Sequence, residues 1–161
     1  LSQLVPGGSF ETINCKLVKD KTIQRGIYTF PNPNELHQEL YDALLEHHES
    51  PTAKLKIHQW IASICSVLTA SVSLTTKIFQ GCSVMVEDDY HFSFPLISLT
   101  MLMLDPYYRT ISGFQILIEH IWIRFGFPFA ISSGFGSSNK SADPFDLGIF
   151  NQFIDCVWQM Y

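Results

Sequence analysis

One stretch of this 161-residue sequence has the order of elements that many proteins use to bind phosphate. Residues 82–86 are typical of a short buried strand, an acidic run follows at Glu87, Asp88 and Asp89, and an apolar helix is predicted over residues 94–104. In a strand–loop–helix of this kind, backbone N–H groups and the positive end of the helix dipole converge on an anion. This order of elements is therefore the layout of a phosphate-binding loop.

The same loop also contains side chains that could bind a metal or transfer a proton. His91 lies close to Asp88 and Asp89, and histidine and carboxylate are common metal ligands. The sequence offers no second histidine at a suitable spacing, so a solvated histidine beside a solvated acidic run is the plainer interpretation. We therefore predict no metal site and no cofactor.

Four basic residues, Lys16, Lys19, Lys21 and Arg25, gather near the N-terminus. They lie on a strand–loop–strand that the pattern predicts within residues 14–30. A solvated strand face is the plainer interpretation of this cluster, and a site for an anionic lipid headgroup is the alternative.

Composition excludes several classes of protein. Hydrophobic residues make up 47% of the chain and charged residues 16%, which rules out a disordered chain and a coiled-coil rod. The net charge of −5 argues against general nucleic-acid binding. The longest apolar run, residues 94–104, is about half the roughly 20 residues that a spanning helix needs, so no membrane span is expected.

The cysteines indicate the compartment. Cys15, Cys65, Cys82 and Cys156 are widely scattered and form no Cys-x-x-Cys motif. Isolated cysteines in a hydrophobic chain are typical of buried, reduced thiols, so an intracellular protein is expected.

Helices are predicted around the strand–loop–helix. The first has Asn32 as its cap, Pro33 in its first position and Glu35 in the position of a capping box. A second follows over residues 52–75, another begins at Ser112, and a last one begins near residues 143–144 after a loop. The sum is an α/β chain dominated by helices.

Three long motifs are similar to one known family. They are SLTMLMLDPYYRTISGF at residues 98–114, WIRFG at residues 122–126, and IFNQFIDCVWQ at residues 149–159. These stretches resemble the myotubularin family of phosphoinositide 3-phosphatases. The resemblance is strong over residues 96–161, fair over residues 30–86 and weak before that.

The resemblance implies a nucleophile loop of the form Cys-x-x-Gly-x-Asp-Arg between the strand and the helix. An ungapped count back from the helix puts Val86 at the Cys position, Asp89 at the Gly, His91 at the Asp and Phe92 at the Arg. The chain has no Cys-x5-Arg anywhere, so the expectation is an inactive member of the family, a pseudophosphatase and not an enzyme.

The resemblance further implies an α/β fold like that of the Cys-dependent dual-specificity and tyrosine phosphatases, a sheet with flanking helices, here as a helix-rich fragment. Residues 1–161 would form part of a single phosphatase-like domain, incomplete at its C-terminus and also at its N-terminus. The implied function is that of an adaptor or regulator in a hetero-oligomer with an active myotubularin-family phosphatase. The alternative is a phosphoinositide-binding module without turnover. The implied location is cytoplasmic, with a peripheral place on endosomal membranes as an option.

Overall fold

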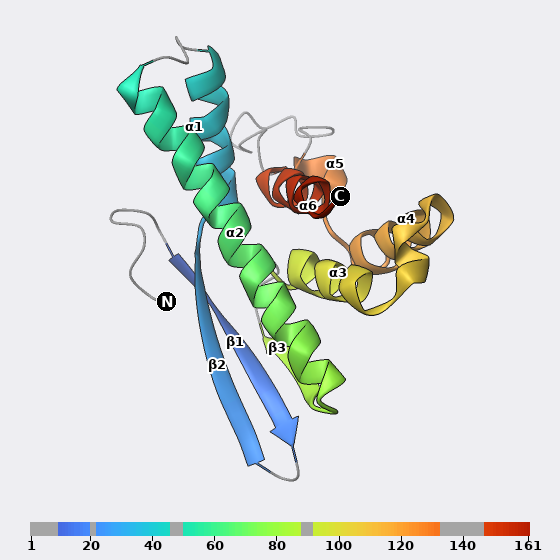
Figure 1. Ribbon diagram of the computed structural model, residues 1–161. Coiled ribbons are helices and arrows are strands. Elements are labelled where there is room, and N and C mark those ends of the chain that lie inside the picture. The colour runs from blue at the N-terminus through green and yellow to red at the C-terminus, as the bar shows by residue number, and fades with distance from the viewer. Residues whose placement is uncertain (1–9, 20–21, 46–49, 88–91, 133–146) are drawn as a thin grey trace.

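The computed structural model describes residues 10–19, 22–45, 50–87, 92–132 and 147–161. Side chains are described outside residues 10–29 and a few further positions in β3 and α5. Figure 1 shows a long central helix, α2 (Pro51–Phe79), that runs along a small sheet and separates it from most of the other helices. Helix α2 contacts two strands of the sheet and the helices α1 (Pro33–Leu45), α3 (Ser93–Leu104) and α6 (Gly148–Met160).

The sheet has three antiparallel strands. Strands β1 (Phe10–Lys19) and β2 (Thr22–Pro31) form a hairpin, and β3 (Ser83–Glu87) pairs with the other edge of β1, so the order is β2-β1-β3. The predicted strand–loop–strand and the predicted strand near residues 82–86 are therefore confirmed. The wider sheet expected of a Cys-dependent phosphatase is not found among the described residues, where helices dominate.

Local signals explain where the first two helices begin. Asn32 accepts a hydrogen bond from the backbone N–H of Asn34 at 3.0 Å and donates one to the Glu35 carboxylate at 3.3 Å, as the sequence predicted for its cap. Ser50 caps α2, because its hydroxyl accepts from the N–H of Ala53 at 3.1 Å. Helix α2 ends at Phe79, four residues later than predicted, and Gly81 then takes a φ of 79° that reverses the chain into β3.

The C-terminal half departs further from the prediction. A 3-10 turn, η1 (Pro106–Arg109), precedes α4 (Ile111–Leu117), and Thr110 caps α4, not Ser112. A π-helical turn, η2 (Ile118–Ile123), follows directly. The expected loop contains a short helix, α5 (Phe129–Ser132), and α6 begins at Gly148, not near residues 143–144.

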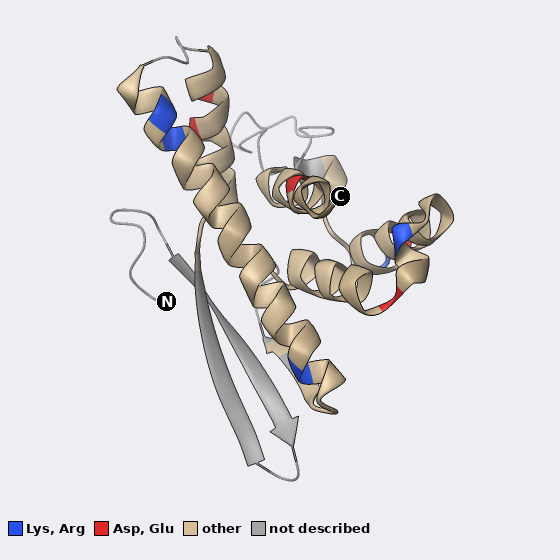
Figure 2. Ribbon diagram, viewed as in Figure 1, with Lys and Arg blue, Asp and Glu red and all other residues tan. Residues whose placement is uncertain are grey.

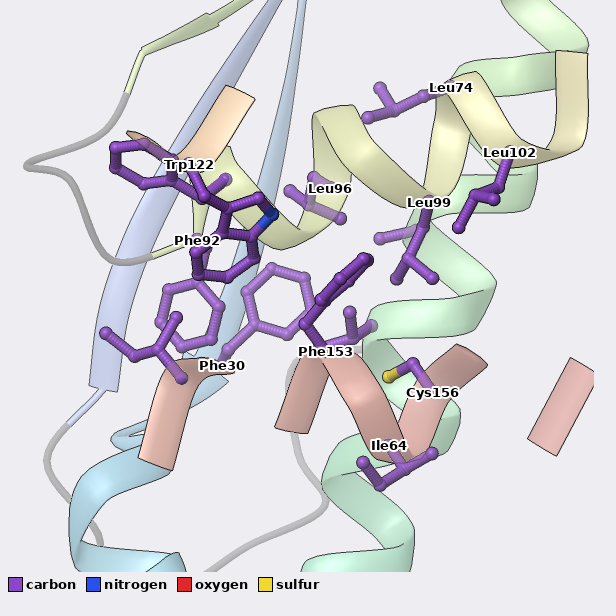
Figure 3. Packing of buried hydrophobic residues seen from close by; sticks show 14 of the residues in the cluster. Phe30, Ile64, Leu74, Phe92, Leu96, Leu99, Leu102, Trp122, Phe153 and Cys156 are labelled. Carbon is purple, nitrogen blue, oxygen red and sulfur yellow. The ribbon is translucent and has the colours of Figure 1, made fainter. Parts of the chain in front are cut away.

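The core is centred on aromatic side chains from distant parts of the chain. Trp122 is fully buried, and its indole N–H donates to the Ser98 hydroxyl at 3.0 Å. Its ring centroid lies 5.1 Å from that of Phe153, and Figure 3 shows both in one cluster with Phe30, Phe92 and aliphatic side chains of α2 and α3. The π turn at η2 inserts one extra residue into the helical path at this point.

Helix α2 is long and apolar enough to cross a membrane by length and composition alone, a stretch that the sequence analysis did not consider as a span, and the expectation of no membrane span stays a prediction. Such a helix is weak evidence of a span, because core helices of globular domains pass the same test. Its buried residues recur at three-and-four spacing and face the core; they are Ala53, Trp60, Ser63, Ile64, Val67, Ala70, Ser71, Leu74 and Thr75. One face of α2 therefore packs on the core, while 33% of its apolar window is buried in total.

Candidate functional site

The structure places the ends of the predicted phosphate loop in the core. Val86, near the end of β3, is half-buried and packs against the core cluster. Phe92, just before α3, is fully buried, and its ring stacks on that of Phe30 with centroids 4.9 Å apart (Figure 3). Of the four positions assigned by the ungapped count, these two meet in one apolar cluster. Asp89 and His91 lie outside the described residues.

The N-terminus of α3 shows how the loop enters the helix. Phe92 stands at the cap position with a helical φ of −107° and ψ of −14°, and no side chain caps the helix there. The apolar residues that follow, Phe94 and Leu96, are buried. Helix α3 is therefore held by its packing against α2 and α6.

The basic cluster lies on the hairpin. Lys16 is the register partner of Arg25 across β1 and β2, and Lys19 is the partner of Thr22 at the hairpin end. The side chains of Lys16, Lys19 and Arg25, and the whole of Lys21, lie outside the described residues. Both interpretations of the basic cluster, a solvated strand face and a site for an anionic lipid headgroup, therefore stay predictions.

Three described cysteines are free thiols in different environments. Cys65 is exposed, Cys82 is half-buried and Cys156 is fully buried. The expectation of buried thiols therefore holds for Cys156 and is wrong for Cys65. Burial, with smaller contributions from Asp155 and Cys65, raises the pKa of the Cys156 thiol to about 12. Cys156 is thus protonated at neutral pH and unsuited to act as a nucleophile.

Among the described residues, no group of three or more histidine, cysteine, aspartate or glutamate side chains could hold a metal ion. His91 and its neighbouring acids are outside that part of the chain. The predictions of no metal and no cofactor stay predictions.

A row of polar contacts joins α6 to α1 and α2, and the sequence did not predict it. Gln152, which is fully buried, donates to the Ser63 hydroxyl at 2.7 Å, and the Trp60 indole donates to Asp155 at 2.6 Å. The signal in the sequence is the spacing of Asn151, Gln152 and Asp155 along one helix, on turns whose other residues are apolar. Polar groups buried at such positions require partners on the facing helices.

Comparison with known proteins identifies the family of this chain. The sequence matches the family model of the Myotubularin-like phosphatase domain over residues 6–161. The chain belongs to the myotubularin family. This confirms the resemblance that the motifs in the C-terminal half had indicated.

Three relatives show how small a part of each longer protein this chain covers. The chain is 43% identical over 111 residues to Myotubularin of Xenopus laevis, across 67% of this chain and 18% of that protein. It is 38% identical over 109 residues to Phosphatidylinositol-3,5-bisphosphate 3-phosphatase MTMR6 of Caenorhabditis elegans, across 66% of this chain and 16% of that protein. It is also 30% identical over 164 residues to Probable serine/threonine-protein kinase pats1 of Dictyostelium discoideum, across 96% of this chain and 5% of that protein. The chain thus spans less than a fifth of the length of these myotubularin relatives.

The expectation that the chain is not an enzyme is wrong. It matches a phosphatase domain family, and a myotubularin relative is named as a 3-phosphatase. The expectation rested on an ungapped count through residues 86–92, of which residues 88–91 lie outside the described part of the chain, and on the absence of a Cys-x5-Arg motif from these 161 residues, which span less than a fifth of the myotubularin relatives. A count of this kind assumes that no residue is inserted or deleted in the loop, and loops tolerate both.

Proposed function

We propose that this myotubularin-family chain is part of a phosphatase domain that removes the 3-phosphate from phosphoinositides. The observation that carries the proposal is the 38% identity to a protein named as a phosphatidylinositol-3,5-bisphosphate 3-phosphatase. The layout of β3, loop and α3 supports it, because a strand followed by a helix N-terminus is suited to an anion. We infer that the three described strands belong to the sheet of a Cys-dependent phosphatase-like fold.

The full-length protein is expected to release inorganic phosphate from phosphatidylinositol 3,5-bisphosphate or phosphatidylinositol 3-phosphate, and not from the 4-phosphate. The acidic run Glu87–Asp88–Asp89 begins at the last residue of β3 and precedes α3 in the chain, and it repels an anionic substrate. The triple variant Glu87→Gln, Asp88→Asn, Asp89→Asn should therefore lower KM several-fold at low salt. The measurement is phosphate release from mixed vesicles as a function of lipid concentration.

A matched control separates a local effect from a change in net charge. The variant Glu39→Gln, Asp42→Asn, Glu119→Gln changes the charge by the same amount on α1 and η2, away from β3, and should leave KM unchanged. No phosphate release, under conditions in which another myotubularin turns over the lipid, would contradict the proposal. Vesicle binding without release, lost when Lys16, Lys19 and Lys21 are changed to glutamate, would favour the alternative of a lipid-binding module.

We also propose that the full-length protein assembles with a second myotubularin-family phosphatase at the cytoplasmic surface of endosomal membranes. Large apolar side chains that remain exposed support it, among them Phe125 at 70% and Trp158 at 78%. A tagged full-length protein, purified from its own cells, is expected to bring down another family member in stoichiometric amount.

The matched variants for this assembly use exposed apolar residues in different parts of the fold. Phe125→Ser with Trp158→Ser should reduce the recovered partner, whereas Leu55→Ser, at a residue exposed on α2, should not. Recovery of the protein alone, or with proteins of unrelated families, would refute the assembly and leave the phosphatase proposal to its own assay.

A further inference from the structure

The first turns of α1 and α6 lie in close contact. A Cβ added to Gly148 would lie 2.7 Å from both the Asn34 Cα and the Pro33 carbonyl oxygen. Distances this short leave no room for a side chain, so the two backbones approach as closely as glycine allows. The contact between α1 and α6 is therefore set by backbone fit at this end.

One turn further along both helices, the contact becomes polar. Nε2 of His37 on α1 lies 2.9 Å from the side-chain nitrogen of Asn151 on α6. The His37 ring also lies against the Trp60 ring of α2, with centroids 5.8 Å apart and a tilt of 56°. A single imidazole thus touches both helices against which α1 packs.

The other ring nitrogen of His37 is enclosed without a partner. Nδ1 is buried and makes no hydrogen bond to any group in the described part of the chain. When the Asn151 amide nitrogen donates to Nε2, the neutral ring carries its single proton on Nδ1, whereas an imidazolium has an N–H donor on both nitrogens. Charging the ring therefore buries an unsatisfied cationic donor and sets a second donor against Asn151 if its nitrogen faces Nε2.

The surroundings offer little compensation for that charge. Neither Trp60 nor Asn151 titrates. On α6, the Asp155 carboxylate already accepts hydrogen bonds from the Trp60 indole at 2.6 Å and from Gln159 at 3.1 Å. The acids of α1 closest to His37 in the chain are Glu35 and Glu39. On α2, the titratable residues that come just before Trp60 in the chain are Lys56 and His58, and neither offers a carboxylate to an imidazolium.

Protonation of His37 lowers the stability of this contact as the pH falls. Burial lowers the pKa of His37 below its ordinary value of 6.5. When α1 is released the ring regains its ordinary pKa, so the released state binds more protons as pH falls through 6.5. The contribution of this contact to stability is complete above that pH and declines between it and the lowered pKa.

We propose that His37 is a pH-sensitive joint between α1, α2 and α6, whose neutral ring holds α1 in place and whose protonation loosens it. The joint is independent of the phosphatase proposal, since it lies between helices and not at the β3–α3 loop. It gives the domain a contact that weakens in mildly acidic surroundings while the apolar core stays unchanged.

The test is hydrogen–deuterium exchange of the full-length protein at about pH 7.5 and about pH 5.5, corrected for intrinsic exchange rates. Peptides covering α1 (Pro33–Leu45) are expected to lose protection several-fold at the lower pH, whereas peptides covering α3 are not. His37→Gln, which cannot gain a charge, should remove most of this pH dependence. His58→Gln, at an exposed histidine on α2, should retain it.

A second variant tests the charge itself. Asn151→Asp is close to the same size and places a carboxylate opposite Nε2, so it should favour the imidazolium and keep α1 protected at the lower pH. Equal loss of protection in His37→Gln and wild type would overturn the proposal. So would a wild-type α1 that shows no pH dependence, or an Asn151→Asp variant that behaves like wild type.

Discussion

Trp122→Ala is expected to lower the free energy of unfolding by about 3–5 kcal/mol, the range for removing a large buried aromatic side chain. Trp122 is 0% exposed, and its ring centroid lies within 5.5 Å of those of four phenylalanines. These are Phe94, Phe127, Phe150 and Phe153. The change also leaves the Ser98 hydroxyl without its indole partner. Equilibrium urea unfolding measures the loss.

Trp158 provides the matched control for this prediction. It lies on α6 and is 78% exposed, so Trp158→Ala should change the free energy of unfolding by no more than about 0.5 kcal/mol. Trp122→Phe should fall between the two, because it keeps an aromatic ring but loses volume and the N–H donor. Equal effects of the Trp122 and Trp158 changes to alanine would show that the aromatic cluster is not the centre of the core.

Gly113→Ala is the second change with a large expected effect. Gly113 lies in the first turn of α4, and a Cβ there would lie 1.9 Å from the carbonyl oxygen of Tyr107 and 2.6 Å from its carbonyl carbon. Backbone atoms cannot rotate away as a flexible side chain can, so η1 and α4 must move apart. The expected destabilisation is about 3 kcal/mol, the upper part of the usual range for overpacking.

Ser112→Ala is the control for this substitution, since Ser112 is the exposed neighbour of Gly113 and does not cap the helix. We expect it to change the free energy of unfolding by less than about 0.5 kcal/mol. A Gly113→Ala variant with wild-type stability would mean that η1 and α4 do not approach each other as described.

The N-termini of α1 and α4 show why the cap of α1 was predicted correctly and the cap of α4 was not. Asn32, Pro33 and Glu35 are adjacent in the chain and satisfy each other locally, so their pattern predicts the start of α1. Ser112 has the same spacing to Gln115, yet Thr110 is the cap. The preceding turn η1 is what presents Thr110, and η1 depends on Gly113 to fit against it, which no local pattern contains.

The row of polar contacts between α6 and the helices α1 and α2 could not be predicted, for a related reason. His37 and Asn151 are 114 positions apart, and Trp60 and Asp155 are 95 apart. Each residue alone is an ordinary polar position on a helix. Only the packing of α1, α2 and α6 brings each one to its partner.

For the candidate site too, some features could be predicted from the sequence and others could not. The order of strand, acidic loop and apolar helix follows from hydrophobic periodicity, and the motifs over residues 98–114 and 149–159 are specific enough to indicate the family that the comparison then confirmed. The ungapped count could not establish which loop residue corresponds to which position of the family motif. That correspondence depends on the geometry of the loop and not on hydrophobic periodicity.

Strand and helix positions, the caps of α1 and the family thus follow from short-range patterns, since they depend on residues within a few turns of each other. The burial of Val86 and Phe92, the role of Trp122 as the centre of the core and the joint at His37 depend on contacts across the whole chain. Those contacts exist only once α2 has brought the sheet and the other helices together (Figure 1). Among the residues whose side chains are described, no Lys, Arg, Asp or Glu is buried, because burying an unpaired charge would cost more than the packing returns. Figure 2 shows that these residues are few along the described helices.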